Sequence, residues 1–366
     1  MTALRNTVFL ILAVLPAHAG DWSPRLAAEY LDARQQEWSA WPAAKAPGGA
    51  CISCHTGMTY LLARPALRKA IGELQPTRYE KDLLDGLRAR VDKREGKDLF
   101  AAFAKEPLAS EALGVESILA ALFLAQENNG GRLSAKAELA FDRMWSFEQR
   151  DGKGKGAWPW FELDLDPWET TESPFYGATL AALAVGAAPA SYLARPDVRK
   201  HIDELTAYLR NAQDGQPLHN RLMLLWASSA LTGLWPQPAR LRLVEEVFAR
   251  QQTDGGWTLE SLGPWKERSA AIVAAGSNSY ATAVAALALE QGGVTASDSR
   301  MVNALNWLRS HQDQRRGYWA AGSMNKRYPA GSMQELFMQD AATAFAALAL
   351  ATADERAMQR SVSSDR

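Results

Sequence analysis

This sequence contains only two cysteines, no excess of charge of one sign and few long apolar runs. The two cysteines lie three positions apart, and no second cluster of Cys and His accompanies them, which argues against a four-ligand structural zinc site. The 40 Lys and Arg residues nearly balance the 41 Asp and Glu residues and form no basic stripe, so nucleic acid is not an expected partner. Beyond the N-terminal segment no apolar run is long enough to span a bilayer, so we expect no transmembrane segment in the mature protein.

Both cysteines belong to the sequence Cys51-Ile52-Ser53-Cys54-His55. This is the spacing of c-type haem attachment, in which two thiols add to the haem vinyl groups and the adjacent imidazole binds the iron. A thioredoxin-like dithiol is the alternative, but it expects a neighbouring βαβ pattern, and no strand-rich segment adjoins residues 51–55. The motif therefore predicts one covalent haem c, attached through Cys51 and Cys54, with His55 as an iron ligand.

The N-terminus has the pattern of a secretory signal peptide. Arg5 precedes an apolar run from Val8 to Leu15, and Pro16-Ala17-His18-Ala19 supplies a cleavage site. We expect cleavage after Ala19 and a periplasmic or secreted protein, with an uncleaved N-terminal anchor as the alternative. Export agrees with the haem motif, because in the cytochrome c family that the motif resembles, haem is attached on the far side of the bacterial inner membrane.

The tryptophans mark an internal repeat. Three segments, 144–158, 247–257 and 307–319, each read as the end of a helix with a Gln, then a glycine turn and a Trp. An almost wholly apolar helix follows each segment and suits the interior, whereas the preceding helices carry charge on one face and suit an outer shell. Six such pairs predict an all-α protein, a single (α/α)6 toroid over 20–354 that carries the haem motif in its first repeat, with a polar tail at 355–366. Outer helices are expected near residues 25–38, 78–91, 135–149, 197–212, 239–252 and 298–311, and inner helices near 56–70, 111–127, 173–186, 217–232, 278–290 and 339–352.

The pattern at Gln149–Trp158, Gln251–Trp257 and Gln312–Trp319 resembles the QW repeats of the squalene-hopene and oxidosqualene cyclases, whose fold is an α/α toroid. The resemblance covers roughly residues 135–352 and implies that these Gln and Trp side chains tie the ends of outer helices together. It does not imply cyclisation, because the family's acid motif Asp-x-Asp-Asp is represented only by Asp164-Leu165-Asp166-Pro167 and because those cyclases have two toroids. Single-toroid relatives, the prenyltransferase β-subunits and lanthionine cyclases, bind zinc through Cys and His, and both cysteines here are assigned to haem.

The second axial ligand of the iron decides between two kinds of haem protein. We expect His55 at the start of the first inner helix, at one mouth of the toroid, and His219 opens another inner helix, which makes it the best His candidate for the opposite side of the iron. A bound side chain would make the protein an electron carrier, and an open position would allow peroxide or oxygen chemistry. The methionine candidates are Met324, Met333 and Met338, and the less suited histidines, on predicted outer helices, are His201 and His311.

An acidic and aromatic segment at 158–172 precedes a predicted inner helix. Its carboxylates suit acid-base chemistry and its rings an apolar or sugar face, although a solvated loop whose acids favour the helix N-terminus explains the same pattern. Two carboxylates here would also suit a carbohydrate-active enzyme, an interpretation that leaves the haem motif unexplained. Asn278 and Asp340 also begin predicted inner helices, and helix capping explains both. The candidate catalytic residues are Asp164, Asp166, Glu169, Glu172 and Tyr176.

These features together predict an exported haem c protein that acts in redox chemistry, as an enzyme or as an electron carrier with a partner protein. The toroid would supply a cavity for an apolar molecule, isoprenoid by analogy with the cyclases. The alternative is a non-redox enzyme or binding protein, terpenoid-cyclase-like or carbohydrate-active, in which the toroid cavity acts and haem is structural or absent.

Overall fold

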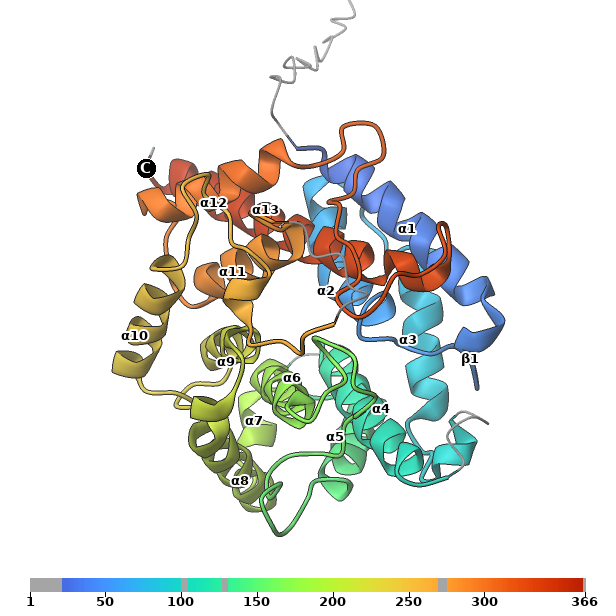
Figure 1. The fold of residues 1–366 in the computed structure, drawn as a ribbon. Coiled ribbons are helices and arrows are strands. Elements are labelled where there is room, and N and C mark those ends of the chain that lie inside the picture. The colour runs from blue at the N-terminus through green and yellow to red at the C-terminus, as the bar shows by residue number, and fades with distance from the viewer. Residues whose placement is uncertain (1–21, 100–104, 127–130, 269–274, 365–366) are drawn as a thin grey trace, which may run out of the picture.

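The computed structural model describes residues 22–99, 105–126, 131–268 and 275–364 (Figure 1). Over these ranges the protein is predominantly helical, which confirms the expected all-α class. The predicted signal peptide, residues 1–19, lies outside the described residues together with its cleavage site. Every predicted helix is present, and most of their ends fall within three residues of the predicted ones.

The helices alternate along the chain between the two predicted sets. The outer set comprises α1 (Pro24–Ala40), α3 (Arg78–Arg90), α5 (Ala135–Ser146), α8 (Pro196–Ala212), α10 (Gln237–Phe248) and α12 (Ser299–Ser310). The inner set comprises α2 (Gly57–Ala70), α4 (Leu108–Leu124), α6 (Ser173–Ala187), α9 (Leu218–Ala230), α11 (Ser279–Gln291) and α13 (Phe337–Ser364). The sequence pattern does not predict three short elements, which are α7 (Ala190–Leu193) and the antiparallel ribbon of β1 (Lys45–Ala46) and β2 (Gly49–Ala50).

The two sets of helices differ in burial as their composition predicts. α4, α6 and α11 are buried along almost their whole length, whereas α8 buries only Val198, Leu205 and Leu209. Figure 1 shows α6, α9 and α11 nearer the centre of the molecule than α8, α10 and α12. The burial of the Ala- and Leu-rich helices therefore separates the inner set from the outer one.

From α4 onward the inner helices pack in sequence order, and the last one packs against the first, α2. α4 packs against α6, α6 against α9, α9 against α11, and α11 against α13. α13 then packs against α2, and also against α1. The two ends of the helical chain are therefore in contact.

The repeat tryptophans make the same hydrogen bond in each copy. Each indole is fully buried and donates its N–H to a backbone carbonyl near the end of the outer helix that precedes it. A buried indole N–H needs such an acceptor, so the bond fixes the turn against its helix. The bonds run from Trp158 to Met144 at 2.6 Å, from Trp257 to Val247 at 2.8 Å, and from Trp319 to Leu308 at 2.7 Å.

The repeat glycines contact the next outer helix. Each has a positive φ, and a Cβ at its position would overlap a backbone carbonyl oxygen of that helix. Only glycine combines this backbone conformation with so close an approach. The pairs are Gly156 with Glu204 of α8, Gly255 with Asn303 of α12, and Gly317 with Leu26 of α1.

Two of the repeat glutamines bridge the same joints. Gln251 donates from Nε2 to the carbonyl of Arg300 in α12, at 2.9 Å. Gln312 accepts from the backbone N–H of Ser23 at 2.6 Å and donates to the Ser23 carbonyl at 3.0 Å. Ser23 is the N-cap of α1, so the final repeat is bonded to the start of the first helix.

The C-terminal helix differs from its prediction at both ends. α13 continues beyond the predicted boundary at 354 to Ser364, and Asp340 lies in its first turn instead of capping it, whereas Asn278 does cap α11. With the preceding 3-10 turn, Met333–Val362 is long and apolar enough to cross a membrane, but 78% of its most apolar stretch is buried within the fold. Such burial is the pattern of a core helix, and the absence of a spanning segment stays a prediction.

Candidate functional site

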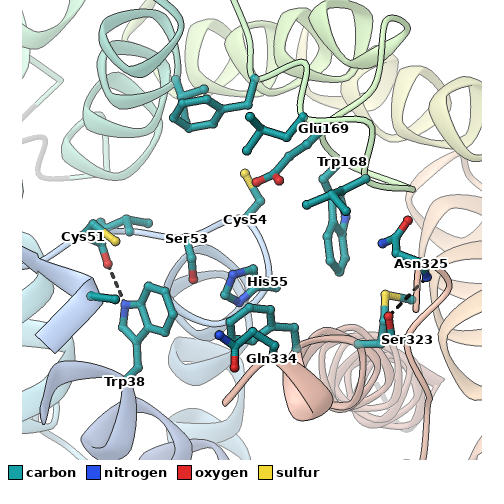
Figure 2. Close-up of a pocket in the computed structure, with 18 of the residues that line it drawn as sticks. Trp38, Cys51, Ser53, Cys54, His55, Trp168, Glu169, Ser323, Asn325 and Gln334 are labelled. Atoms are coloured by element: carbon teal, nitrogen blue, oxygen red, sulfur yellow. Dashed lines mark hydrogen bonds between the residues drawn. The ribbon is translucent and has the colours of Figure 1, made fainter. Parts of the chain in front are cut away.

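The haem motif lines a cavity of about 390 Å³ beside the start of α2 (Figure 2). Five parts of the chain form its wall: the end of α1, segment 51–55, the first turns of α4, the acidic segment, and the stretch that leads into α13. The wall is mostly apolar with a few polar groups, which is the usual composition of a ligand site. Its aromatic and polar members include Trp38, Phe161, Trp168, Glu169, Asn325, Tyr328 and Phe337, and Met338 also lines it.

Cys51 and Cys54 are both free thiols on this wall. The backbone of Cys51 is held on both sides, because its N–H donates to Ala44 at 2.7 Å and its carbonyl accepts from the indole of Trp38 at 2.8 Å. Burial raises the pKa of the Cys51 thiol to about 12, and it raises that of Cys54 as well. Thiols of this kind stay protonated at neutral pH, whereas a catalytic dithiol needs a lowered thiol pKa.

The imidazole of His55 is enclosed by aromatic rings. Phe337 stacks on it with ring centroids 3.4 Å apart and planes at 16°, and Trp38 meets it edge-on at 5.1 Å. Trp168 lies 6.3 Å away on the cavity wall. Burial lowers the pKa of His55 to about 3, with the charge of Arg34 as a smaller cause, so the ring is neutral at physiological pH. A neutral imidazole is the form that binds a metal.

The hydrogen bonds of His55 fix which nitrogen carries its proton. Nδ1 lies 2.9 Å from Oγ1 of Thr56, and that hydroxyl donates its hydrogen to Asp340 at 2.8 Å. The hydroxyl has a single hydrogen, so it accepts from Nδ1–H of His55. Nε2 therefore carries a lone pair, and it has no hydrogen-bond partner within the described residues.

The opposite rim of the cavity joins two loops. Asn325 donates from its amide to the carbonyl of Asp166 at 2.8 Å and accepts from the Asp166 N–H at 2.9 Å. This reciprocal pair connects the acidic segment to the stretch before α13. Of the three predicted methionine ligands, only Met338 lines the cavity, and Met333 accepts instead from the guanidinium of Arg34.

The acidic segment is divided between two cavities. Asp164 and Asp166 both pair with Arg268, and Asp164 also pairs with Lys266 at 2.5 Å, which holds the pKa of Asp164 below its usual range. Burial raises the pKa of Asp166, which lines the haem-motif cavity and also a second cavity of about 410 Å³. The second cavity contains Glu172 as well, whose carboxylate accepts from Thr170 at 2.9 Å.

Glu169 is the acidic residue beside Cys54. Its side chain lies beside Cys54 on the cavity wall, as Figure 2 shows, and its charge contributes to the raised pKa of the Cys54 thiol. Burial, with Glu111 as the smaller cause, raises the pKa of Glu169 to about 7. A carboxyl with this pKa can give or take a proton near neutral pH.

His219 and Tyr176 do not reach the cavity. His219 is fully buried, with Nε2 bonded to the hydroxyl of Tyr280 at 2.8 Å and Nδ1 to Asn220 at 2.9 Å, so both of its nitrogens are engaged away from His55. Tyr176 is also fully buried, and its hydroxyl faces Met58 at 4.0 Å. Neither residue lines the haem-motif cavity, and their roles as iron ligand and catalytic residue stay predictions. Apolar burial explains both positions, because each belongs to an inner helix.

The sequence pattern misses several residues that shape the site. Phe337 stacks on His55, Asn325 fixes the rim, and Thr56 accepts from the imidazole and donates to Asp340. One signal was present for Thr56, since it follows His55 directly. For the others no local pattern exists, because they come from distant parts of the chain.

Comparison with protein-family models gives no match for this sequence. Comparison with curated proteins gives no significant match either.

Proposed function

We propose that this chain is an exported, c-type haem protein built on a single (α/α)6 toroid, with one haem bound covalently through Cys51 and Cys54 and ligated by His55. It acts as a redox enzyme or an electron carrier in the periplasm or outside the cell. The observation that carries the proposal is that Cys51, Cys54 and a neutral His55, whose Nδ1 is bonded to Thr56, line one mostly apolar cavity.

The residues present fit a haem. A porphyrin needs a broad apolar site, and Trp38, Trp168 and Phe337 supply apolar ring surface around the imidazole. Metal-binding histidines usually donate their second nitrogen to a fixed acceptor, as His55 does to Thr56. When bound, haem would supply one-electron chemistry and an iron centre whose second axial position is open or filled.

The toroid is supported by the repeat contacts. The Gly317 and Gln312 contacts with α1, and the packing of α13 on α2, are those that a closed ring requires. The bonds of Gln251 and Gln312 to the next outer helix agree with the role that the resemblance to the QW repeats implies. We include in this proposal that the chain belongs to the α/α toroid family of the squalene cyclases.

The remaining parts of the proposal concern the small molecule and the partner protein that would bind near the haem. The apolar wall would accept an apolar small molecule, isoprenoid by analogy only, and electron transfer would need a partner protein. Met338 is the candidate for a second protein ligand to the iron, because it lies on the cavity wall and His219 does not.

The non-redox alternatives are less well supported. A cyclase-type acid must be protonated and very strong, but Asp164 is ion-paired and its pKa is lowered. A carbohydrate-active site needs two carboxylates free for acid and base roles, and Arg268 pairs with both Asp164 and Asp166. Zinc binding lacks a ligand set, since no group of three or more His, Cys, Asp and Glu side chains gathers in the described ranges.

The test is a pyridine haemochrome spectrum of the protein exported from a host with haem c maturation machinery. We expect a covalent c-type band that denaturation does not release. The double variant Cys51→Ala, Cys54→Ala should lose it, whereas His311→Ala should retain it, because His311 stacks on Trp307 at 3.7 Å, away from the cavity. A colourless, folded wild-type protein from the same host would overturn the proposal.

Carbon monoxide binding to the ferrous protein then separates the two redox roles. Rapid binding indicates an open position and an enzyme, and slow or absent binding indicates a filled one and a carrier. If Met338 fills it, Met338→Ala should speed binding, while Met324→Ala, at a buried position off the cavity wall, should not.

A further inference from the structure

We propose that Thr56 and Asp340 are positioning residues for the haem iron, which act through His55 to fix its tautomer and strengthen its Nε2 as a ligand. This inference rests on the proposed function, because it concerns the same imidazole. It assigns a role to a buried Asp whose sequence position indicates only helix capping.

The chain of contacts is short and directed. Nδ1–H of His55 donates to Oγ1 of Thr56 over 2.9 Å, and Thr56 donates to Oδ2 of Asp340 over 2.8 Å. All the donors point toward the carboxylate, which is the acceptor at the end of the chain. The negative charge of Asp340 is therefore transmitted to the imidazole through one hydroxyl.

Asp340 is itself held in place. Its carboxylate accepts from Arg34 Nε at 2.8 Å, from Arg34 Nη2 at 3.1 Å, and from the hydroxyl of Tyr30 at 2.9 Å. Asp340 is fully buried, and Arg34 is 3% exposed. Burial raises the pKa of Asp340, and the bidentate guanidinium of Arg34 opposes that rise by stabilising the charged carboxylate.

Helix capping does not account for this arrangement. Asp340 lies in the first turn of α13, and its carboxylate accepts from side chains of α1 and from Thr56, just before α2. A buried ion pair seldom stabilises a core more than apolar side chains of the same size would. The location of the Arg34–Asp340 pair, one hydroxyl away from the proposed iron ligand His55, therefore calls for another explanation.

The consequence for a ligated iron follows from the direction of the bonds. A hydrogen bond from Nδ1–H toward a carboxylate increases the electron density on the imidazole and the basicity of Nε2. A more basic ligand stabilises ferric over ferrous iron, so the contact lowers the reduction potential. The stacked ring of Phe337 and the edge of Trp38 hold the imidazole plane, and the Thr56 bond sets its rotation within that plane.

The test measures the midpoint potential of the haem protein by spectroelectrochemistry. Thr56→Val removes the hydroxyl with almost no change in volume, and we expect a higher midpoint potential. Thr56→Ser restores a hydroxyl and should return the potential toward the wild-type value. Thr59→Val is the matched control, because Thr59 is a neighbouring buried threonine whose hydroxyl bonds backbone carbonyls, that of His55 at 2.7 Å, and not the ring.

A second readout follows the iron-imidazole bond directly. Resonance Raman of the ferrous protein after photolysis of bound carbon monoxide should show a lower iron-histidine stretching frequency in Thr56→Val than in the wild type. Thr56→Ala serves the same purpose if the valine variant does not fold. Asp340→Asn should move the potential in the same direction as Thr56→Val.

The outcomes are distinguishable. A wild-type protein without covalent haem overturns the proposed function and this inference together. A wild-type protein with covalent haem, and Thr56 variants whose potential and stretching frequency match those of Thr59→Val, overturns the inference alone. A shift in Thr56→Val that serine reverses supports it, since a merely structural role would not discriminate between these variants.

Discussion

Gly317 packs directly against the carbonyl oxygen of Leu26, although these residues come from opposite ends of the helical chain. Gly317 has φ +80°, and a Cβ there would overlap the backbone of α1. The equivalent glycine of the preceding repeat, Gly255, makes the same contact with the next outer helix in sequence. The joint at Gly317 thus repeats an internal joint of the chain at the place where its two ends meet.

Replacing Gly317 with Ala should destabilise the protein more than the backbone conformation alone explains. Gly293 offers the comparison, because it has φ +98° but open space around its α-carbon. Gly293→Ala should cost about 1–2 kcal/mol for the left-handed conformation. Gly317→Ala should cost about 1–3 kcal/mol more, from overpacking against α1. Equal midpoints in urea for the two variants would show that the contact with Leu26 does not stabilise the fold.

The indole N–H of a repeat tryptophan should contribute measurably to stability. Trp257→Phe removes the bond to the Val247 carbonyl and leaves that buried acceptor unpaired, for an expected loss of about 1–3 kcal/mol. Trp235 is the matched control, because it is also buried but its Nε1 finds no acceptor in the described structure. Trp235→Phe should therefore cost less. Denaturant unfolding of both variants gives the comparison, and a larger loss for Trp235→Phe would contradict the role assigned to the repeat bond.

The helices can be predicted from the sequence because each is specified by residues close together in the chain. The Ala- and Leu-rich run of α11 and the capping Asn278 specify one inner helix without reference to the rest of the chain. The length of α13 is harder to predict, because its final turns beyond 354 are more polar and continue only as an extension of a buried helix. Short elements such as α7 carry too few residues to show a period.

The site is only partly readable from the sequence. The motif at 51–55 shows the thiols and the imidazole of the proposed site, since covalent haem attachment would require them close together in the chain. The residues around His55 meet it through tertiary packing, so Asp340 is 285 positions away in the printed sequence and carries no local sign of its role. His219 shows the opposite difficulty, because a histidine at the start of an inner helix is equally well explained by a buried bond to Tyr280.

The pair between Asn325 and Asp166 should control the mobility of the cavity rim. Asn325→Ala removes both hydrogen bonds to the backbone of Asp166, so we expect faster amide hydrogen exchange across residues 161–169. Losing one to two hydrogen bonds of about 1 kcal/mol each predicts a fall in protection of roughly tenfold. Asn211→Ala, an exposed change on α8, should leave this segment unaffected. Unchanged protection in Asn325→Ala would mean that other contacts hold the two loops together.

The titration of Glu169 should appear in both stability and redox behaviour. Its pKa rises from an ordinary value of 4.5 to about 7 in the folded protein, so its contribution to the free energy of unfolding is fully present below pH 4.5 and is lost as the pH rises through 7. Above pH 7 the carboxylate carries a negative charge beside Cys54, and this charge favours ferric iron in the proposed haem. The midpoint potential should therefore fall across this pH range, by at most about 59 mV per pH unit for one electron coupled to one proton.

Glu169→Gln should flatten that pH dependence, because the amide does not titrate. Glu162→Gln, an exposed change in the same acidic segment that does not face the haem-motif cavity, should retain it. Spectroelectrochemical titrations from pH 5 to 9 on the three proteins give the measurement. A wild-type slope that persists in Glu169→Gln would assign the coupled proton to another group, and Asp166 would be the first to replace, since it is the other acid of this segment on the same wall with a raised pKa.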